Sequence, residues 1–200
     1  MGKSVALGCI VLILVGVLVV GGMAAGAYNK LNAADQGVSA GWAQVENVYQ
    51  RRADLIPNLV ETVKGAANFE KDTLTQVIQA RASATQVKLD ANSIKDPVAF
   101  EKFQKAQDQL GSAIGRLLVA VEKYPELKAN QNYRDLQTQL EGTENRISVE
   151  RGRFNDVTQA YNPLRRSFPT VIVANFAGFK DRPYFKAAEG SEKPPQVKFN

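Results

Sequence analysis

Residues 133–161, YRDLQTQLEGTENRISVERGRFNDVTQAY, carry the most regular apolar pattern of the chain. Nine positions in this stretch follow an alternating spacing of three and four residues, and seven of them are apolar or aromatic. Side chains spaced in this way share one face of a helix and pack as the seam of a coiled coil. The stretch therefore predicts one long amphipathic helix, which Asn162-Pro163 is expected to end. The nine positions are Tyr133, Leu136, Leu140, Thr143, Ile147, Glu150, Phe154, Val157 and Tyr161.

The same spacing recurs in residues 28–63. Asp35 and Arg52 are the two polar residues of this lattice. The period continues through Pro57 without a change of phase, which favours a single helix kinked at the proline. A new helix, capped by Asp54 and with Pro57 in its first turn, is the alternative. The apolar and aromatic lattice positions are Tyr28, Leu31, Val38, Trp42, Val45, Tyr49, Ile56, Leu59 and Val63.

Two further amphipathic helices are predicted between these seams, over residues 70–89 and 98–124. Pro125 opens the turn after the second of them, and Gly111 and Gly115 within it leave room for a neighbouring helix. Four amphipathic segments with short connections bury their apolar faces best as an antiparallel bundle. The expected fold class is therefore all-α, a coiled-coil-like four-helix bundle.

The N-terminal segment is of a different kind. Val5–Ala27 is a run of 23 almost wholly apolar residues. A hydrocarbon layer of roughly 30 Å needs about 20 helical residues, so this run is long enough to span a membrane. A cleaved signal peptide, with the small residues 25–27 at its cleavage site, is the alternative, although its apolar core is usually shorter. The expected division is a transmembrane anchor at 1–29 that continues into the bundle at 30–186, then a flexible polar tail at 187–200.

The distribution of charge bears on location and partners. Lys3 and Lys30 flank the apolar run, so the count of positive charges on its two sides nearly ties. A short basic start before a long apolar run resembles an uncleaved signal, which predicts a bundle on the non-cytoplasmic side. The net charge is +5, but Lys and Arg are interspersed with acids and never form a run of five. Nucleic acid is therefore not an expected partner.

Residues that carry catalysis or bind cofactors are scarce. The chain has no histidine, and Cys9 in the apolar run is its single cysteine, which excludes His-based triads and zinc sites. No phosphate-binding glycine loop occurs. Glu141, Glu144 and Glu150 share one helix and could form an acid/base set, but carboxylates on a helix are usually solvated or ion-paired. We therefore expect no catalytic residue, no metal, no cofactor and no enzymatic activity.

Several long motifs resemble the LemA family of bacterial single-span membrane proteins. They are YNKL (28–31), RRADLIPNLVETVKG (51–65), QARASA (79–84), ENRISVERGRFNDVTQAYN (144–162) and FAGFKDRPYF (176–185). The resemblance covers nearly the whole chain and implies a membrane helix followed by an all-helical bundle, located at the bacterial inner or cell membrane. It implies no catalytic residue and no established molecular function. One departure is GAANFE (65–70), where relatives often have an aromatic residue and a histidine.

The dipeptide Arg51-Arg52 precedes Pro57 by about one helical turn, and Arg52 is a position of the first seam. If the first and last long helices run antiparallel, residues lie level when their numbers sum to roughly 193, which places Arg52 opposite Glu141. We expect Arg51 or Arg52 to pair with Glu141 or Glu144 at the half-buried edge of the bundle and so to set its register. The alternative is that both arginines are solvated and their alkyl stems cover the seam. The candidate structural or interaction residues are Arg51, Arg52, Asp54, Pro57, Asn58, Glu141, Glu144, Arg146 and Glu150.

Three functions fit these features. The first is a membrane-anchored scaffold or interaction protein that forms a homo-oligomer and contacts membrane lipid. The second is a membrane-tethered sensor or adaptor, in which the Pro57 kink and the apolar patch from Phe168 switch binding of a protein partner, with the C-terminal tail as a contact. The third is an enzyme acting at the membrane, which the missing histidine and nucleotide motifs disfavour.

The length of the apolar run generates a first prediction. Because Val5–Ala27 exceeds a signal-peptide core, we expect it to be retained in the mature protein. Intact-mass measurement on the membrane fraction should give the mass of the whole chain, 21.8 kDa. A mature N-terminus at Tyr28 would contradict the anchor.

Overall fold

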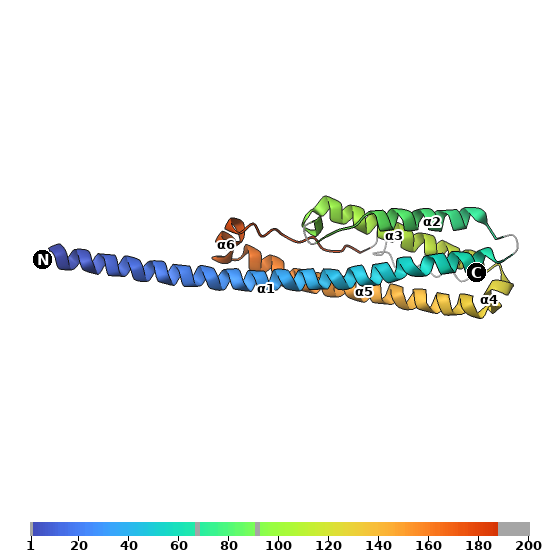
Figure 1. Cartoon of the computed structure of the whole chain (residues 1–200), viewed down its shortest axis with the longest axis horizontal. Coiled ribbons are helices and arrows are strands. Elements are labelled where there is room, and N and C mark those ends of the chain that lie inside the picture. The colour runs from blue at the N-terminus through green and yellow to red at the C-terminus, as the bar shows by residue number, and fades with distance from the viewer. Residues whose placement is uncertain (1, 67–68, 91–92, 188–200) are drawn as a thin grey trace, which may run out of the picture.

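The computed structural model describes residues 2–66, 69–90 and 93–187, and within them every regular element is helical. The molecule is an elongated rod in which α1 runs the full length and the other helices gather along its C-terminal half (Figure 1). The all-α bundle predicted from the sequence is confirmed. The elements are α1 (Gly2–Lys64), α2 (Lys71–Gln86), η1 (Ser93–Lys95), α3 (Pro97–Val121), α4 (Pro125–Ala129), α5 (Gln131–Arg166) and α6 (Thr170–Phe176).

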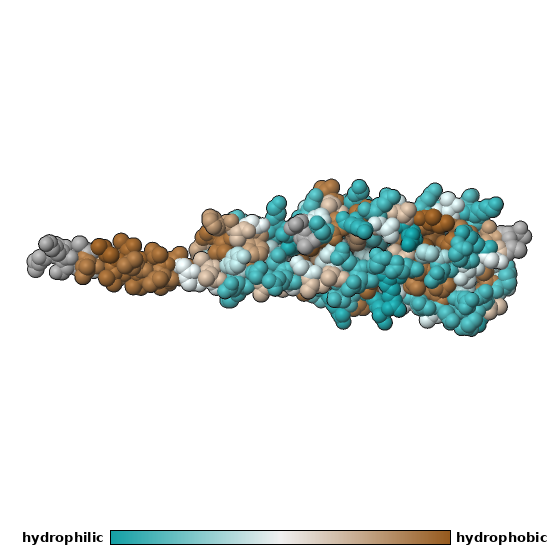
Figure 2. Space-filling view, in the orientation of Figure 1, coloured by the Kyte–Doolittle hydropathy of each residue, from teal (hydrophilic) through white to brown (hydrophobic). Residues whose placement is uncertain are grey.

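Helix α1 has two parts with opposite environments. From Leu7 to Met23 its large apolar side chains are 51–74% exposed, and they form the apolar end in Figure 2. From Leu31 to Val63 the apolar seam predicted from the sequence is buried. The helix continues through Pro57, so the two parts belong to one element. By length and composition its N-terminal part is a candidate membrane span.

The bundle consists of two antiparallel helix pairs, α1 with α5 and α2 with α3 (Figure 1). α1 and α5 approach closely at Gly41, where an added Cβ would lie 3.2 Å from Val157 Cγ2. The core near α4 is mostly aliphatic. The core nearer the apolar end is aromatic, with Trp42 in contact with a ring of phenylalanines. These are Phe100, Phe103, Phe154 and Phe185, with ring centroids 5.2–6.2 Å from Trp42.

Several predicted boundaries were wrong. α2 and α3 each end three residues earlier than expected, and Pro125 begins the short helix α4. α5 does not stop at Asn162-Pro163 but continues to Arg166. Proline removes one N–H and one intrahelical bond. Tertiary contacts hold this last turn in place, because the buried Asn162 side chain exchanges two 2.9 Å hydrogen bonds with the backbone of Arg182.

The segment 177–187 after α6 is non-helical and returns along the bundle. Asn155 holds Phe185 by two backbone bonds of 2.9 and 3.0 Å, and Gln104 holds Lys186 at 2.9 and 3.3 Å. Phe185 is thereby inserted among the aromatic side chains of the core, with 6% exposure. The segment thus acts as a strap that closes the aromatic core. The predicted flexibility of the tail concerns mainly residues 188–200, which lie outside the described residues.

The strap generates a second prediction. Phe185→Ala should lower the free energy of unfolding by about 3–5 kcal/mol, because it removes a buried aromatic side chain and leaves a cavity. The neighbouring Tyr184 is 41% exposed, so Tyr184→Ala serves as the matched control and should cost about 1 kcal/mol or less. Denaturation in mild detergent followed by ellipticity measures both. Equal, small effects would show that the strap does not stabilise the core.

Candidate functional site

Arg52 is the most unusual side chain of the bundle because it is a cation with 2% exposure. It occupies a lattice position of the α1 seam, between Tyr49 and Ile56. Its Nη1 donates to Glu144 Oε1 of α5 at 3.0 Å. Its Nη2 donates to two acceptors of Gln107 on α3, the backbone oxygen at 3.0 Å and Oε1 at 2.6 Å. One guanidinium therefore joins α1, α3 and α5 at a single level of the rod.

Gln107 extends these contacts to the fourth helix. Its Nε2 donates to the backbone oxygen of Ala84 in α2 at 3.3 Å. Gly111, one turn along α3, lies beside the guanidinium: a Cβ there would be 3.5 Å from Arg52 Nη1, whereas one at Gly115 would meet nothing within 4 Å. The close approach predicted for both glycines thus holds at Gly111 only. All four long helices meet at this cluster.

A second arginine is held directly beside the first. Arg151 of α5 donates from Nε to the Tyr49 hydroxyl at 2.5 Å and from Nη2 to Asp108 of α3 at 2.6 Å. The guanidinium carbons of Arg52 and Arg151 lie 5.2 and 5.6 Å from the centre of the Tyr49 ring. Burial raises the pKa of Tyr49, against the opposing effect of the two arginines. Tyr49 therefore stays neutral between the two cations at physiological pH.

The proline of the opening motif has its own partner. Within a helix the N–H of residue 57 would donate to the carbonyl of Ala53, and proline has no N–H. Arg81 of α2 supplies the missing donor, since its Nε lies 2.8 Å from the Ala53 oxygen. The buried carbonyl therefore keeps a partner, and Pro57 is accommodated in the middle of α1. Arg81 belongs to the QARASA motif, which links two of the sequence motifs by one hydrogen bond.

The other polar position of the α1 seam is also paired. Asp35 accepts a hydrogen bond from Nη2 of Arg182, a residue of the strap with 3% exposure. The Arg182 guanidinium lies 5.7 Å from the ring centre of Tyr161, whose hydroxyl donates to the Lys180 oxygen at 2.9 Å. Burial, with a smaller contribution from Asp35, raises the pKa of Tyr161 to about 12. Tyr161 therefore remains a protonated donor and holds the strap to α5.

The predicted residues divide into one pair and a set of surface positions. Arg52 and Glu144 pair, one of the pairs expected from the register, but Arg52 is buried and not at the half-buried edge. The register predicted from residue numbers placed Arg52 opposite Glu141, three residues or about one turn from its actual partner Glu144. Glu141 is exposed and accepts a hydrogen bond from Gln137. Arg51, Asp54, Pro57, Asn58 and Arg146 are exposed, and Glu150 pairs with Arg153.

Sequence reasoning missed Gln107, Arg81, Arg151 and Arg182. Gln107 had a detectable signal, because it occupies a lattice position between Phe103 and Leu110. The other three carry no such signal. Arg81 and Arg151 act from the flanks of their helices, and Arg182 lies in a non-helical segment.

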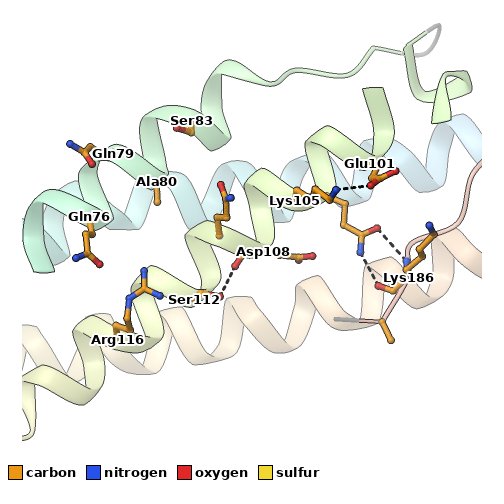
Figure 3. A pocket seen from close by; sticks show the side chains of 13 residues that line it. Gln76, Gln79, Ala80, Ser83, Glu101, Lys105, Asp108, Ser112, Arg116 and Lys186 are labelled. Atoms are coloured by element: carbon orange, nitrogen blue, oxygen red, sulfur yellow. Dashed lines mark hydrogen bonds and ion pairs between the residues drawn. The ribbon is translucent and has the colours of Figure 1, made fainter. Parts of the chain in front are cut away.

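A surface groove of about 710 Å³ lies next to this cluster, between α2, α3 and Lys186 of the strap (Figure 3). Its labelled side chains come mainly from α2 (Gln76, Gln79, Ser83) and α3 (Glu101, Lys105, Asp108, Ser112, Arg116). Glu101 and Lys105 pair at 2.7 Å. In the described part of the chain, no three carboxylate or thiol side chains converge as metal ligands. The groove and the cluster offer hydrogen bonding and ion pairing.

Comparisons with known proteins identify the family of this chain. The profile of the LemA family matches residues 41–199. The chain belongs to the LemA family. All the helix-joining contacts of Arg52, Arg81 and Arg151 lie inside the matched region, whereas the apolar end of α1 and Asp35 lie outside it.

Individual relatives of this LemA-family chain are distant. The magnetosome protein MamQ of Magnetospirillum gryphiswaldense is 26% identical over 189 residues, which cover 85% of this chain and 70% of the relative. MamQ 2 of Paramagnetospirillum magneticum is 26% identical over 183 residues, covering 84% and 67%. The protein LemA of Metamycoplasma hominis is 26% identical over 145 residues, covering 72% and 62%.

The cluster generates a third prediction. Arg52→Ala should lower the free energy of unfolding by about 3 kcal/mol, because it leaves buried acceptors without a donor. Arg51→Ala, at the adjacent exposed position, is the control and should change it by about 0.5 kcal/mol or less. A double-mutant cycle of Arg52→Ala with Glu144→Ala should give a coupling energy of about 1–3 kcal/mol.

The same cycle with Glu141→Ala in place of Glu144→Ala provides the comparison within α5. We expect additivity there, because Glu141 does not contact Arg52. Additivity in both cycles, with folding intact, would mean that apolar packing alone holds this level of the bundle.

Proposed function

We propose that this LemA-family chain is a membrane-anchored helical scaffold that associates with further copies of itself and carries out no catalysis. The observation that supports it best is the continuity of α1, a single helix of 63 residues. Its first part exposes apolar side chains, and its last part forms the seam of the bundle core. A rigid element shared by anchor and domain suits a protein that holds a surface at a fixed distance and direction from the bilayer.

Self-association draws its support from the exposed part of α1. Gly16, Gly21 and Gly22 lie in this apolar segment, and an added Cβ at any of them would meet nothing within 4 Å. Small residues let membrane helices pack closely against one another. Membrane lipid and a second copy of this chain are therefore the partners that we propose, with the bundle on the non-cytoplasmic side and no role for nucleic acid.

The alternative is a membrane-tethered sensor or adaptor. One observation favours it: the strap is non-helical, and the side-chain amides of Asn155, Asn162 and Gln104 hold three of its residues by hydrogen bonds. Release of this strap would expose the aromatic core to a protein partner, and the tail at 187–200 would offer a further contact. This alternative predicts a monomer that changes partner affinity, whereas the scaffold predicts a discrete oligomer.

The scaffold generates a fourth prediction. In lipid nanodiscs or mild detergent, the purified full chain should sediment as a discrete homo-oligomer. Gly16→Leu should reduce the oligomeric fraction, because a large side chain prevents close approach of the helices. Val17→Leu, at the next position, is the matched control and should leave the mass unchanged. A species containing one chain of 21.8 kDa in every condition would contradict self-association.

A further inference from the structure

Helix α6 exposes a concentration of large apolar side chains that the bundle does not explain. Phe168, just before the helix, is 81% exposed, Ile172 is 61% exposed and Phe176 is 97% exposed. Ile172 and Phe176 are four residues apart within α6, so they share one face of the helix. The opposite face is packed, with Thr170 and Ala174 buried against the bundle. Single exposed apolar residues are common on soluble domains, but three on one short amphipathic element indicate a contact surface.

The position of α6 identifies what this surface faces. α6 lies beside α1 at the end of the domain from which the apolar rod emerges (Figure 1). Phe179, three residues after α6, packs its ring 5.9 Å from that of Tyr28. Tyr28 directly follows the predicted span Val5–Ala27. In Figure 2 tan and brown atoms at the place of α6 lie close to the brown rod, with a short pale collar between them.

We propose that α6 is an interfacial membrane contact, with Phe168, Ile172 and Phe176 inserted at the boundary between headgroups and acyl chains of the bilayer that α1 crosses. Short amphipathic elements bind there through aromatic and aliphatic side chains. This inference rests on the membrane anchorage of the proposed function, because it needs the bilayer to end near Tyr28. It goes further by fixing the distance between domain and membrane: the bundle rests on the bilayer surface.

The local hydrogen bonds hold α6 in the orientation that this contact needs. Arg165 donates to the backbone oxygen of Phe179 at 3.1 Å and to the side-chain oxygen of Asn175 at 3.0 Å. Arg166 pairs with Asp181 through bonds of 3.0 and 3.1 Å. These bonds hold the exposed face of α6 in one orientation. The lipid surface around the span is the partner that we propose for it. A second copy of the chain is the competing occupant, and the experiment below separates the two.

The test labels single positions of the full chain. Cys9 is the single cysteine, so Cys9→Ala gives a background in which Phe176→Cys can be labelled with the fluorophore NBD. The matched control is Val119→Cys on α3, which replaces an apolar residue that is 70% exposed and lies near the α4 end of the bundle. Both proteins are reconstituted into phosphatidylcholine–phosphatidylglycerol vesicles, with and without lipid that carries a quenching doxyl group near the glycerol backbone.

We expect roughly a twofold loss of NBD emission at position 176 on adding the doxyl lipid, and none at position 119, since an interfacial helix buries its apolar face about 5–10 Å into the membrane. Phe168→Cys, at the exposed position just before the helix, should repeat the result. Vesicle flotation in the same samples reports the anchor separately: loss of flotation would refute the anchor and this contact together. Flotation with unquenched emission at 176 and 168 would overturn the contact alone, and a blue-shifted but unquenched label would show that protein covers α6 instead.

Discussion

A guanidinium buried in an apolar seam needs a partner for its charge and acceptors for its terminal nitrogens, and this requirement shapes the middle of the bundle. Taking the ion out of water costs several kcal/mol unless acceptors are supplied with good geometry. Arg52 obtains them for its two Nη atoms from Glu144 on α5 and from Gln107 on α3, while its buried Nε has no hydrogen-bond partner. These acceptors reach it only when the three helices stand at one relative height. A shift of any of them by one turn would leave the cation without partners, whereas apolar side chains tolerate such shifts.

A charged seam residue paired with an opposite charge occurs twice along α1. Asp35 and Arg52 are the polar residues of its seam, and each is bound by an opposite charge from another element, the strap in one case and α5 in the other. Between them the aromatic core is closed by Phe185. The two ion pairs therefore hold α1 to its neighbours at two separate levels, to α5 at Arg52 and to the strap at Asp35. Because α1 also carries the apolar end, the bundle and the proposed anchor form one rigid element.

The sequence predicts this architecture well where periodicity carries the information. The seams at 28–63 and 133–161 locate α1 and α5, and the polar positions of the first seam point to Arg52 and Asp35. Periodicity cannot report contacts from helix flanks or from irregular segments, so Arg81, Arg151 and Arg182 stayed hidden. It also misjudged Pro163, because the bonds between Asn162 and Arg182 that hold the last turn of α5 involve residues 20 apart. The three-residue error in register arose because level matching ignores the reach and direction of long side chains.

Arg52 is expected to specify the register between α1 and α5, because its contacts require one relative height of the helices. Spin labels at Gln50→Cys and Ser148→Cys, exposed positions on the two helices, with Cys9→Ala, report that register by electron–electron distance measurement. With Arg52 present, one narrow distance distribution is expected. In the Arg52→Met background, an apolar side chain of similar length should allow additional populations, displaced by up to about 10 Å if the helices slip by a heptad. A single, unchanged distance in the folded Arg52→Met protein would contradict the claim and assign the register to packing alone.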